Sequence, residues 1–401
     1  MTQIRRDKPT VLGYAQLSLF AWVIYGLGAC LALLRDDQGT SRTLSGLHST
    51  SLAVAGIVAA LLAPILMRRR GRGSVMRWCT IAVVVSIAAL LIPRAGYSVT
   101  MMAVASLGFF GTALMISVNA FLFDHQGPAA PAALTEGNAI ASFAGLIAPL
   151  VIGLCAATVL GWRMGMLIAG IGMALVEIVR GSTKPYDVVA SDAGEHADRR
   201  PSPSSPKAFR WSLTLIVCAI GAEYSLVFWG PDLLRDRANF GPAAAAASLA
   251  AVTAGMAIGR AFGSRLALTF SPTTLMRAAI LVALLGFTIA WTFTQGAAVL
   301  FGLLVTGLGL SLLWPLGLSR AIQASGGRAN VAASRASLSV NLAMALAPFA
   351  LGVLADASDI HLALLLVPIL LGIALVILIS TAAPTDENAD ATDAVPTRSP
   401  R

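Results

Sequence analysis

The chain has 401 residues, of which 57% are hydrophobic and only 12% are charged. Soluble domains carry about 25% charged residues, so this composition excludes a soluble enzyme and a disordered chain. It predicts a membrane protein that crosses the bilayer many times. The net charge of +9 then reflects basic residues gathered on the cytoplasmic side of the membrane, rather than nucleic-acid binding.

Twelve segments are long and apolar enough to span a bilayer, which takes about 20 mainly apolar residues. The expected spans lie near residues 11–34, 47–67, 75–93, 97–122, 136–160, 162–180, 209–232, 241–265, 273–292, 296–319, 331–355 and 360–381. The sequence therefore predicts an all-α membrane protein with six spans on each side of a polar stretch.

That polar stretch divides the chain into two predicted bundles. Residues 1–180 form the N-terminal six-helix bundle, residues 181–208 a cytoplasmic linker and residues 209–383 the C-terminal six-helix bundle. Residues 384–401 are polar and acidic, and we expect them to form a disordered tail.

The distribution of basic residues predicts the orientation in the cell membrane. If the N-terminus is cytoplasmic, the expected outer loops hold only six of the 28 basic residues: Arg35, Arg42, Arg94, Arg163, Arg235 and Arg237. This asymmetry agrees with the positive-inside rule and with an even number of spans. We therefore expect both termini to be cytoplasmic.

The two halves contain similar short segments at a nearly constant spacing. Residues 74–78 (SVMRW) resemble residues 274–278 (TLMRA), and residues 148–153 (APLVIG) resemble residues 347–352 (APFALG). Both pairs lie on corresponding spans. Parallel repeats of this kind are typical of transporters whose substrate site lies between the halves, near the middle of the membrane.

This organisation resembles the major facilitator superfamily over the whole membrane portion. Between spans two and three, Arg69, Gly71 and Arg72 match the later part of the family's loop motif Gly-x-Leu-Ala-Asp-Arg-x-Gly-Arg, whereas Arg68 replaces its acidic residue. At an offset of 200 residues, Leu268 replaces the acid in the second half as well. The resemblance implies a secondary active transporter that works by alternating access, but without the family's usual gating acid.

Glu223 is the strongest candidate for a functional residue because it lies near the centre of the seventh span. A carboxylate at this depth is costly unless it is protonated, paired or hydrated. Intramembrane acids usually face water-filled cavities and mark substrate or proton pathways. The alternative is a structural acid that forms a hydrogen bond to a neighbouring helix.

The resemblance implies that spans one, four, seven and ten line the central cavity. Their polar or aromatic residues near the middle are Trp22, Tyr25, Asn119, Tyr224 and Trp314. Aromatic rings stack on sugars or organic cations, and the Asn119 carboxamide both donates and accepts hydrogen bonds. Packing between helices explains each of these residues equally well.

Four charged residues at three helix ends suggest a cytoplasmic gate. Glu136 and Arg335 begin spans five and eleven, and Arg260 and Arg265 end span eight. In the family, spans five and eight meet between the two halves. We therefore hypothesise that Glu136 pairs with Arg260 or Arg265 as a latch. Simple solvated end charges are the alternative.

Several signatures of other protein classes are absent from the sequence. It contains no Gly-x-x-x-x-Gly-Lys-[Ser/Thr] loop, so ATP hydrolysis is not expected. The four histidines and four cysteines are scattered without ligand spacing, so no metal or cofactor is expected. These absences argue against an enzyme.

The resulting hypothesis is a monomeric transporter of a small organic solute in the lipid bilayer. Protons are the expected energy source, with Glu223 as the coupling residue, and no nucleic-acid partner is expected. An aromatic cavity with one acid slightly favours efflux of drugs or metabolites over uptake of sugars or metabolites. The alternative is a transporter-like membrane sensor that binds solute without moving it.

Overall fold

The computed structural model describes residues 4–182, 186, 205–266, 269–326 and 329–381. Twelve helical segments in this part of the chain are long and apolar enough to cross a membrane. This confirms the predicted all-α architecture. The expected tail at 384–401 and most of the expected linker lie outside the described residues.

The first half contains six spanning helices. They are α1 (Lys8–Gln38), α2 (Arg42–Arg70), α3 (Arg72–Leu90), α4 (Tyr97–Gln126), α5 (Ala130–Ala156) and α6 (Gly161–Arg180), with a short 3-10 turn, η1 (Gly127–Ala129), before α5. Several helices are longer than the apolar runs that predict them, because polar turns continue the helix beyond the hydrocarbon region.

The second half contains six spans built from eight helices. They are α7 (Pro206–Arg237), α8 (Pro242–Leu266), α9 (Pro272–Thr292), α10 (Gly296–Leu310), α11 (Leu313–Ala324), α12 (Ala329–Ala357), α13 (Ile360–Ala363) and α14 (Leu366–Ser380). The tenth span is interrupted between α10 and α11, and the twelfth between α13 and α14.

The ends of α1 illustrate how the sequence sets helix boundaries. The Asp7 side chain accepts a hydrogen bond from the Thr10 backbone N–H at 3.2 Å, and Pro9 occupies the first turn. Both are favourable at a helix start, where backbone N–H groups have no helical partner. Gly39 ends the helix at φ 61°, a left-handed conformation that glycine adopts without steric cost.

Equivalent glycines allow close helix contact in both halves. A methyl group on Gly108 of α4 would collide with the Leu52 carbonyl oxygen of α2. One on Gly307 of α10 would collide with the Val252 carbonyl oxygen of α8 in the same way. Gly108 corresponds to Gly307, and Leu52 to Val252, at the spacing of the sequence repeat. The sequence repeat therefore has a counterpart in the helix packing.

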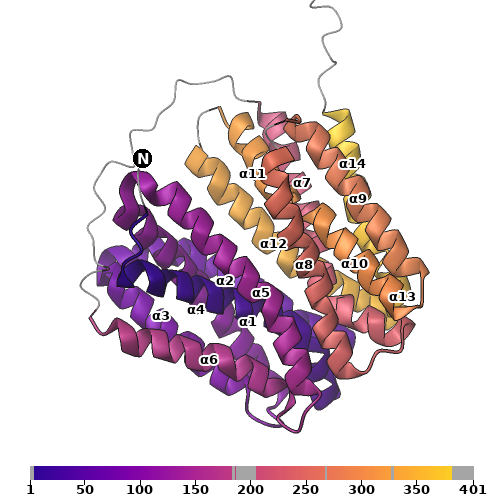
Figure 1. Cartoon of the computed structure of the whole chain (residues 1–401), viewed down its shortest axis with the longest axis horizontal. Coiled ribbons are helices and arrows are strands. Elements are labelled where there is room, and N and C mark those ends of the chain that lie inside the picture. The colour runs from indigo at the N-terminus through magenta and orange to yellow at the C-terminus, as the bar shows by residue number, and fades with distance from the viewer. Residues whose placement is uncertain (1–3, 183–185, 187–204, 267–268, 327–328, 382–401) are drawn as a thin grey trace, which may run out of the picture.

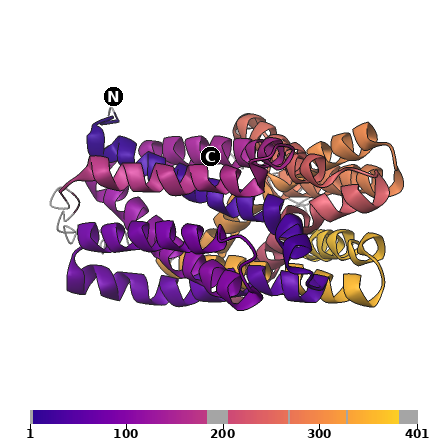
Figure 2. The same ribbon diagram turned by 90° about the horizontal axis from the view of Figure 1, so that it is seen from below.

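The two halves form separate bundles that lie side by side (Figures 1 and 2). Contacts between them join α1 to α7, α2 to α12 and α5 to α8. We call the membrane side on which α6 ends and α7 begins the linker side. In Figure 1 the bundles diverge toward that side.

Candidate functional site

Glu223 lies in the middle of α7 and is only 6% exposed. Its carboxyl group forms a hydrogen bond with the Tyr25 hydroxyl from α1 and lies within electrostatic range of the Arg260 guanidinium from α8, with which it forms no ion pair. The three side chains come from both halves of the molecule. The structure therefore brings Glu223 and Tyr25, both predicted from the sequence, together with a basic residue that was predicted for a different role.

Two residues of α5 position the partners of Glu223. The ring of Tyr25 packs against Gly145, where a methyl group would lie 2.6 Å from the ring carbon Cδ2. Arg260 donates a hydrogen bond from Nη1 to the Ser142 hydroxyl at 3.2 Å. Since these α5 residues are three positions apart, they lie on one helix face. That face supports the tyrosine from its own half and the arginine from the other.

Of the two hypothesised latch pairs, the one between Glu136 and Arg260 is not formed in this conformation. Glu136 instead accepts a hydrogen bond from Arg6 Nε at 3.0 Å, within its own half. The sequence suggested a gate role for Arg260 because the residue lies near a helix end. Its long side chain reaches the centre of the molecule instead. The side chain of Arg265 lies outside the described residues, so the latch stays a prediction.

Two other predicted site residues differ in what surrounds them. The Trp22 indole N–H donates to the Gly165 carbonyl of α6 at 3.0 Å, which directs its ring into the packing of the first half. This contact favours the packing interpretation for Trp22. Asn119 is half-buried, and its Oδ1 has no hydrogen-bond partner. An unsatisfied buried acceptor leaves Asn119 able to bind a ligand.

Tyr224 and Trp314 belong to one apolar cluster between α7, α11 and α12. The Tyr224 ring stacks on Phe228 with centroids 6.1 Å apart. Trp314 also borders a cavity of about 430 Å³ together with Pro315 and Leu318. Both aromatic residues are half-buried, so they combine packing with partial exposure.

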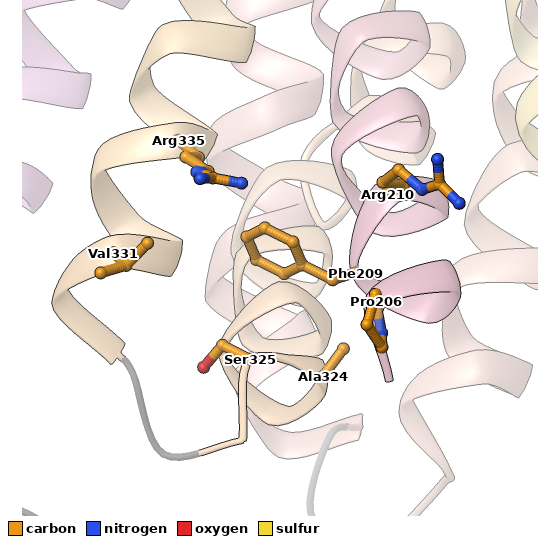
Figure 3. A pocket seen from close by; sticks show the side chains of 7 residues that line it. All are labelled: Pro206, Phe209, Arg210, Ala324, Ser325, Val331 and Arg335. Carbon is orange, nitrogen blue, oxygen red and sulfur yellow. The ribbon is translucent and has the colours of Figure 1, made fainter. Parts of the chain in front are cut away.

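A second cavity of about 340 Å³ lies at the linker-side ends of the same three helices (Figure 3). Arg335 extends from α12 toward the ring of Phe209, with its Cζ 5.9 Å from the ring centroid. The Arg210 guanidinium points away from that ring. Arg335 was predicted at a gate, and the structure places it on the wall of this cavity.

The side opposite the linker is closed by ionic contacts between the halves. Arg35 of α1 donates to Asp232 of α7 from Nη1 at 3.0 Å and from Nη2 at 2.5 Å. Arg235 pairs with Asp36 at 2.7 Å, and the backbone N–H of Thr43 donates to Asp356 at 2.7 Å. These residues were not among the sequence candidates. The opposite charges of Arg35 and Asp232, 197 residues apart, were the available signal.

On the linker side, the described ion pairs stay within the first half. Arg72 pairs with Asp124 at 2.6 Å, and Arg77 pairs with Glu177 at 2.9 Å. Because the polar contacts between the halves extend from the opposite side to the middle of the molecule, this conformation faces the linker side.

The sequence as a whole carries the signature of one family. The pattern of the Major Facilitator Superfamily matches residues 14–319. The chain belongs to the major facilitator superfamily. No curated protein sequence matches this superfamily member.

Solved structures of other superfamily members confirm the fold. A bacterial homolog of the human lysosomal transporter Spinster, inward-facing and unoccupied, gives a TM-score of 0.72 at 14% identity, covering 94% of this chain and 97% of that one. The nucleoside transporter NupG gives 0.70 at 13% identity, covering 93% and 97%. FucP in its outward conformation gives 0.62 at 17% identity, covering 94% and 99%.

Proposed function

We propose that this superfamily member is a secondary active transporter that moves a small organic solute together with protons, and that Glu223 is the coupling residue. The two bundles rock around a central site, so that the site opens alternately to each side of the membrane. The observation that carries the proposal is the position of Glu223. It is buried at the middle of the spanning helix α7, beside side chains of both halves.

The surroundings of Glu223 support a reversible proton site. A buried carboxylate is tolerated when a cation or a hydrogen-bond donor compensates it, and Arg260 and Tyr25 supply both. Because Tyr25 belongs to the first half and Glu223 to the second, rocking of the bundles changes the distance between them. Protonation and conformation are then coupled through the same contacts.

The presence of Arg260 changes the expected direction and cargo. An aromatic cavity with one acid slightly favoured efflux of drugs or metabolites. A guanidinium beside Glu223 offsets the charge that would attract a cation. The proposal is therefore proton-coupled transport, with the direction open to measurement.

The proposed orientation places the linker and both termini in the cytoplasm. On the linker side, basic residues are numerous at the ends of α2 and α3, including Arg68, Arg69 and Arg70. This distribution agrees with the positive-inside rule. In that orientation the present conformation is open toward the cytoplasm.

The test is substrate-dependent proton flux in liposomes that contain the purified protein and a pH-sensitive dye. A panel of organic anions, sugars and cationic drugs would be added outside. We expect substrate-dependent proton flux with the wild type. With Glu223→Gln this flux should be at least about a hundredfold lower, because the group that carries the proton is removed. The matched control is Asp236→Asn, an exposed acid on the same helix.

Each result has a distinct meaning. Equal flux in wild type and Glu223→Gln would contradict coupling at Glu223 but retain transport. Binding of a compound with no movement across the membrane would contradict transport and favour the sensor alternative.

A further inference from the structure

The charge of Arg260 is fixed, whereas the charge of Glu223 can change. An arginine guanidinium stays protonated at every physiological pH, even when it is buried. Among the described residues, the titratable groups that face Glu223 are Tyr25, Tyr224 and Arg260. Both tyrosines are neutral at physiological pH, so only Glu223 supplies a negative charge to balance Arg260.

This pairing gives the central site two charge states. With Glu223 ionised, the acid and Arg260 compensate each other and the site is neutral. With Glu223 protonated, the positive charge of Arg260 has no acidic partner. Arg260 is half-buried, and an uncompensated charge at this depth is unfavourable, so this second state favours binding of an anion from outside the protein.

The linker-side end of the second half offers a positively charged entrance. The acids Asp232, Asp236, Asp356 and Asp359 of that half lie at its opposite end. The linker-side end carries only bases among its described residues: Lys207, Arg210, Arg277, Arg320 and Arg335. A surface of one charge sign concentrates ligands of the opposite sign.

The cavity beside Phe209 lies at this entrance (Figure 3). Arg335 and Arg210 line it, and neither forms an ion pair with a described acid. Arg210 precedes Glu223 by 13 residues on α7, which is about 20 Å along the helix axis. The arginines therefore give the linker-side ends of α7 and α12 a positive charge.

We propose that the solute is a small organic monoanion, which Arg260 binds when Glu223 is protonated. This inference rests on the proposed coupling at Glu223. One proton and one anion then cross together, and the loaded site carries the same net charge as the empty site. Transport by this cycle is electroneutral.

The neighbouring side chains indicate the chemical class of the anion. A guanidinium binds a carboxylate or a phosphate ester through paired N–H···O bonds. The half-buried rings of Tyr25 and Tyr224 flank Glu223 and provide apolar surface for the rest of the molecule. The site therefore fits an anion with an aromatic or apolar body, such as an aryl carboxylate.

The test compares probes that carry different charges on the same ring: benzoate, its neutral amide benzamide and the cation benzylamine, with benzenesulfonate as a second monoanion. Binding to the purified full-length protein would be measured by thermal stabilisation in detergent at pH 5.5 and pH 7.5. We expect the anions to bind at least about tenfold more tightly than benzamide, which is the range of charge-assisted hydrogen bonds. Binding should be tighter at pH 5.5.

Three variants separate this inference from loss of folding. Arg260→Gln should remove the preference for anions, whereas Arg94→Gln, in an exposed loop, should retain it. Glu223→Gln resembles the protonated acid, so it should bind the anions equally well at both pH values. A misfolded protein could not produce that gain at pH 7.5.

The outcomes also separate this inference from the proposed function. The inference is overturned if no anion binds more tightly than benzamide, or if Arg260→Gln binds benzoate as wild type does. If only neutral or cationic compounds produced proton flux, proton coupling would be retained and the inference of an anionic solute would be overturned. Anion binding through Arg260 without proton flux would retain the anion site and contradict coupling.

Discussion

Arg35 and Asp232 form a doubly hydrogen-bonded ion pair that joins α1 to α7 on the side opposite the linker. Their side chains are only 11% and 4% exposed. In a conformation open to that side, α1 and α7 must separate and both charges become hydrated. The pair therefore stabilises the conformation in which this side is closed.

We predict that Asp232→Asn shifts the equilibrium toward the conformation open on the side opposite the linker. Loss of one partner of a buried pair costs about 3–5 kcal/mol, of which only part is relieved by hydration, so we expect a shift of at least about tenfold. Val227 is fully buried where α7 approaches Gly28 of α1. In a variant without the native cysteines, Val227→Cys should react faster with a membrane-impermeant maleimide when Asp232→Asn is present.

The matched control for the ion pair is Asp359→Asn. Asp359 lies on the same side of the molecule, but its side chain accepts a hydrogen bond from its local neighbour Leu362 at 2.8 Å, within its own half. We expect no change in maleimide labelling for this variant. An exchange of the two charges, Arg35→Asp with Asp232→Arg, should slow the labelling again. If it stays fast, the ion pair is not the cause of closure.

Gly108 and Gly307 give a prediction about stability. Alanine at either position collides with backbone of a neighbouring helix, Leu52 or Val252, rather than with a side chain that can move. Overpacking of this kind costs about 1–3 kcal/mol. We expect a lower melting temperature for each variant. Gly372→Ala is the control, because a methyl group there meets no atom within 4 Å and alanine favours the helix. An equal effect at Gly372 would contradict the packing argument.

Asp7 gives a prediction about pH. Burial raises the pKa of its carboxyl group, but hydrogen bonds from Thr10 and His125 outweigh burial and hold the pKa below its ordinary value of 3.8. A carboxyl group with a depressed pKa stabilises the folded state above its unfolded pKa, and this stabilisation is lost as the pH falls through the folded pKa. We therefore expect Asp7→Ala to melt below wild type at pH 7.

The difference in melting temperature between Asp7→Ala and wild type should decrease below pH 3.8. The matched variant is Asp7→Asn, which retains the helix cap but loses the charge that faces His125 at 2.7 Å. At pH 7 its melting temperature should lie between those of Asp7→Ala and wild type. A constant difference from pH 7 to pH 3 would contradict the role of the Asp7 charge.

The spans and the two-bundle architecture could be predicted from the sequence because apolar length and composition determine them directly. The central position of Glu223 was also predictable, since it follows from the bounds of the seventh span. The proximity of Arg260 was not, because the position of a residue near a helix end does not reveal where a long side chain reaches. The contact between Arg35 and Asp232 depends on how two distant helices approach, and no local pattern encodes it.

The last prediction is that Glu136 changes its ion-pair partner when the linker side closes. It pairs with Arg6 here, while Arg260 on the facing helix α8 contacts Ser142, six residues further along α5. Closure of the linker side brings the ends of α5 and α8 together. We predict that Glu136 then pairs with Arg260 or Arg265.

A cysteine pair at positions 136 and 260 tests this exchange. A short bifunctional crosslinker should join the cysteines slowly in wild-type background and at least about tenfold faster with Asp232→Asn, by the same population shift as above. A pair at positions 136 and 6 should show the reverse order. If both pairs react at the same rate in both backgrounds, Glu136 does not change partners. Failure of a charge exchange between Glu136 and Arg260 to restore transport lost in the single variants would argue against the latch as well.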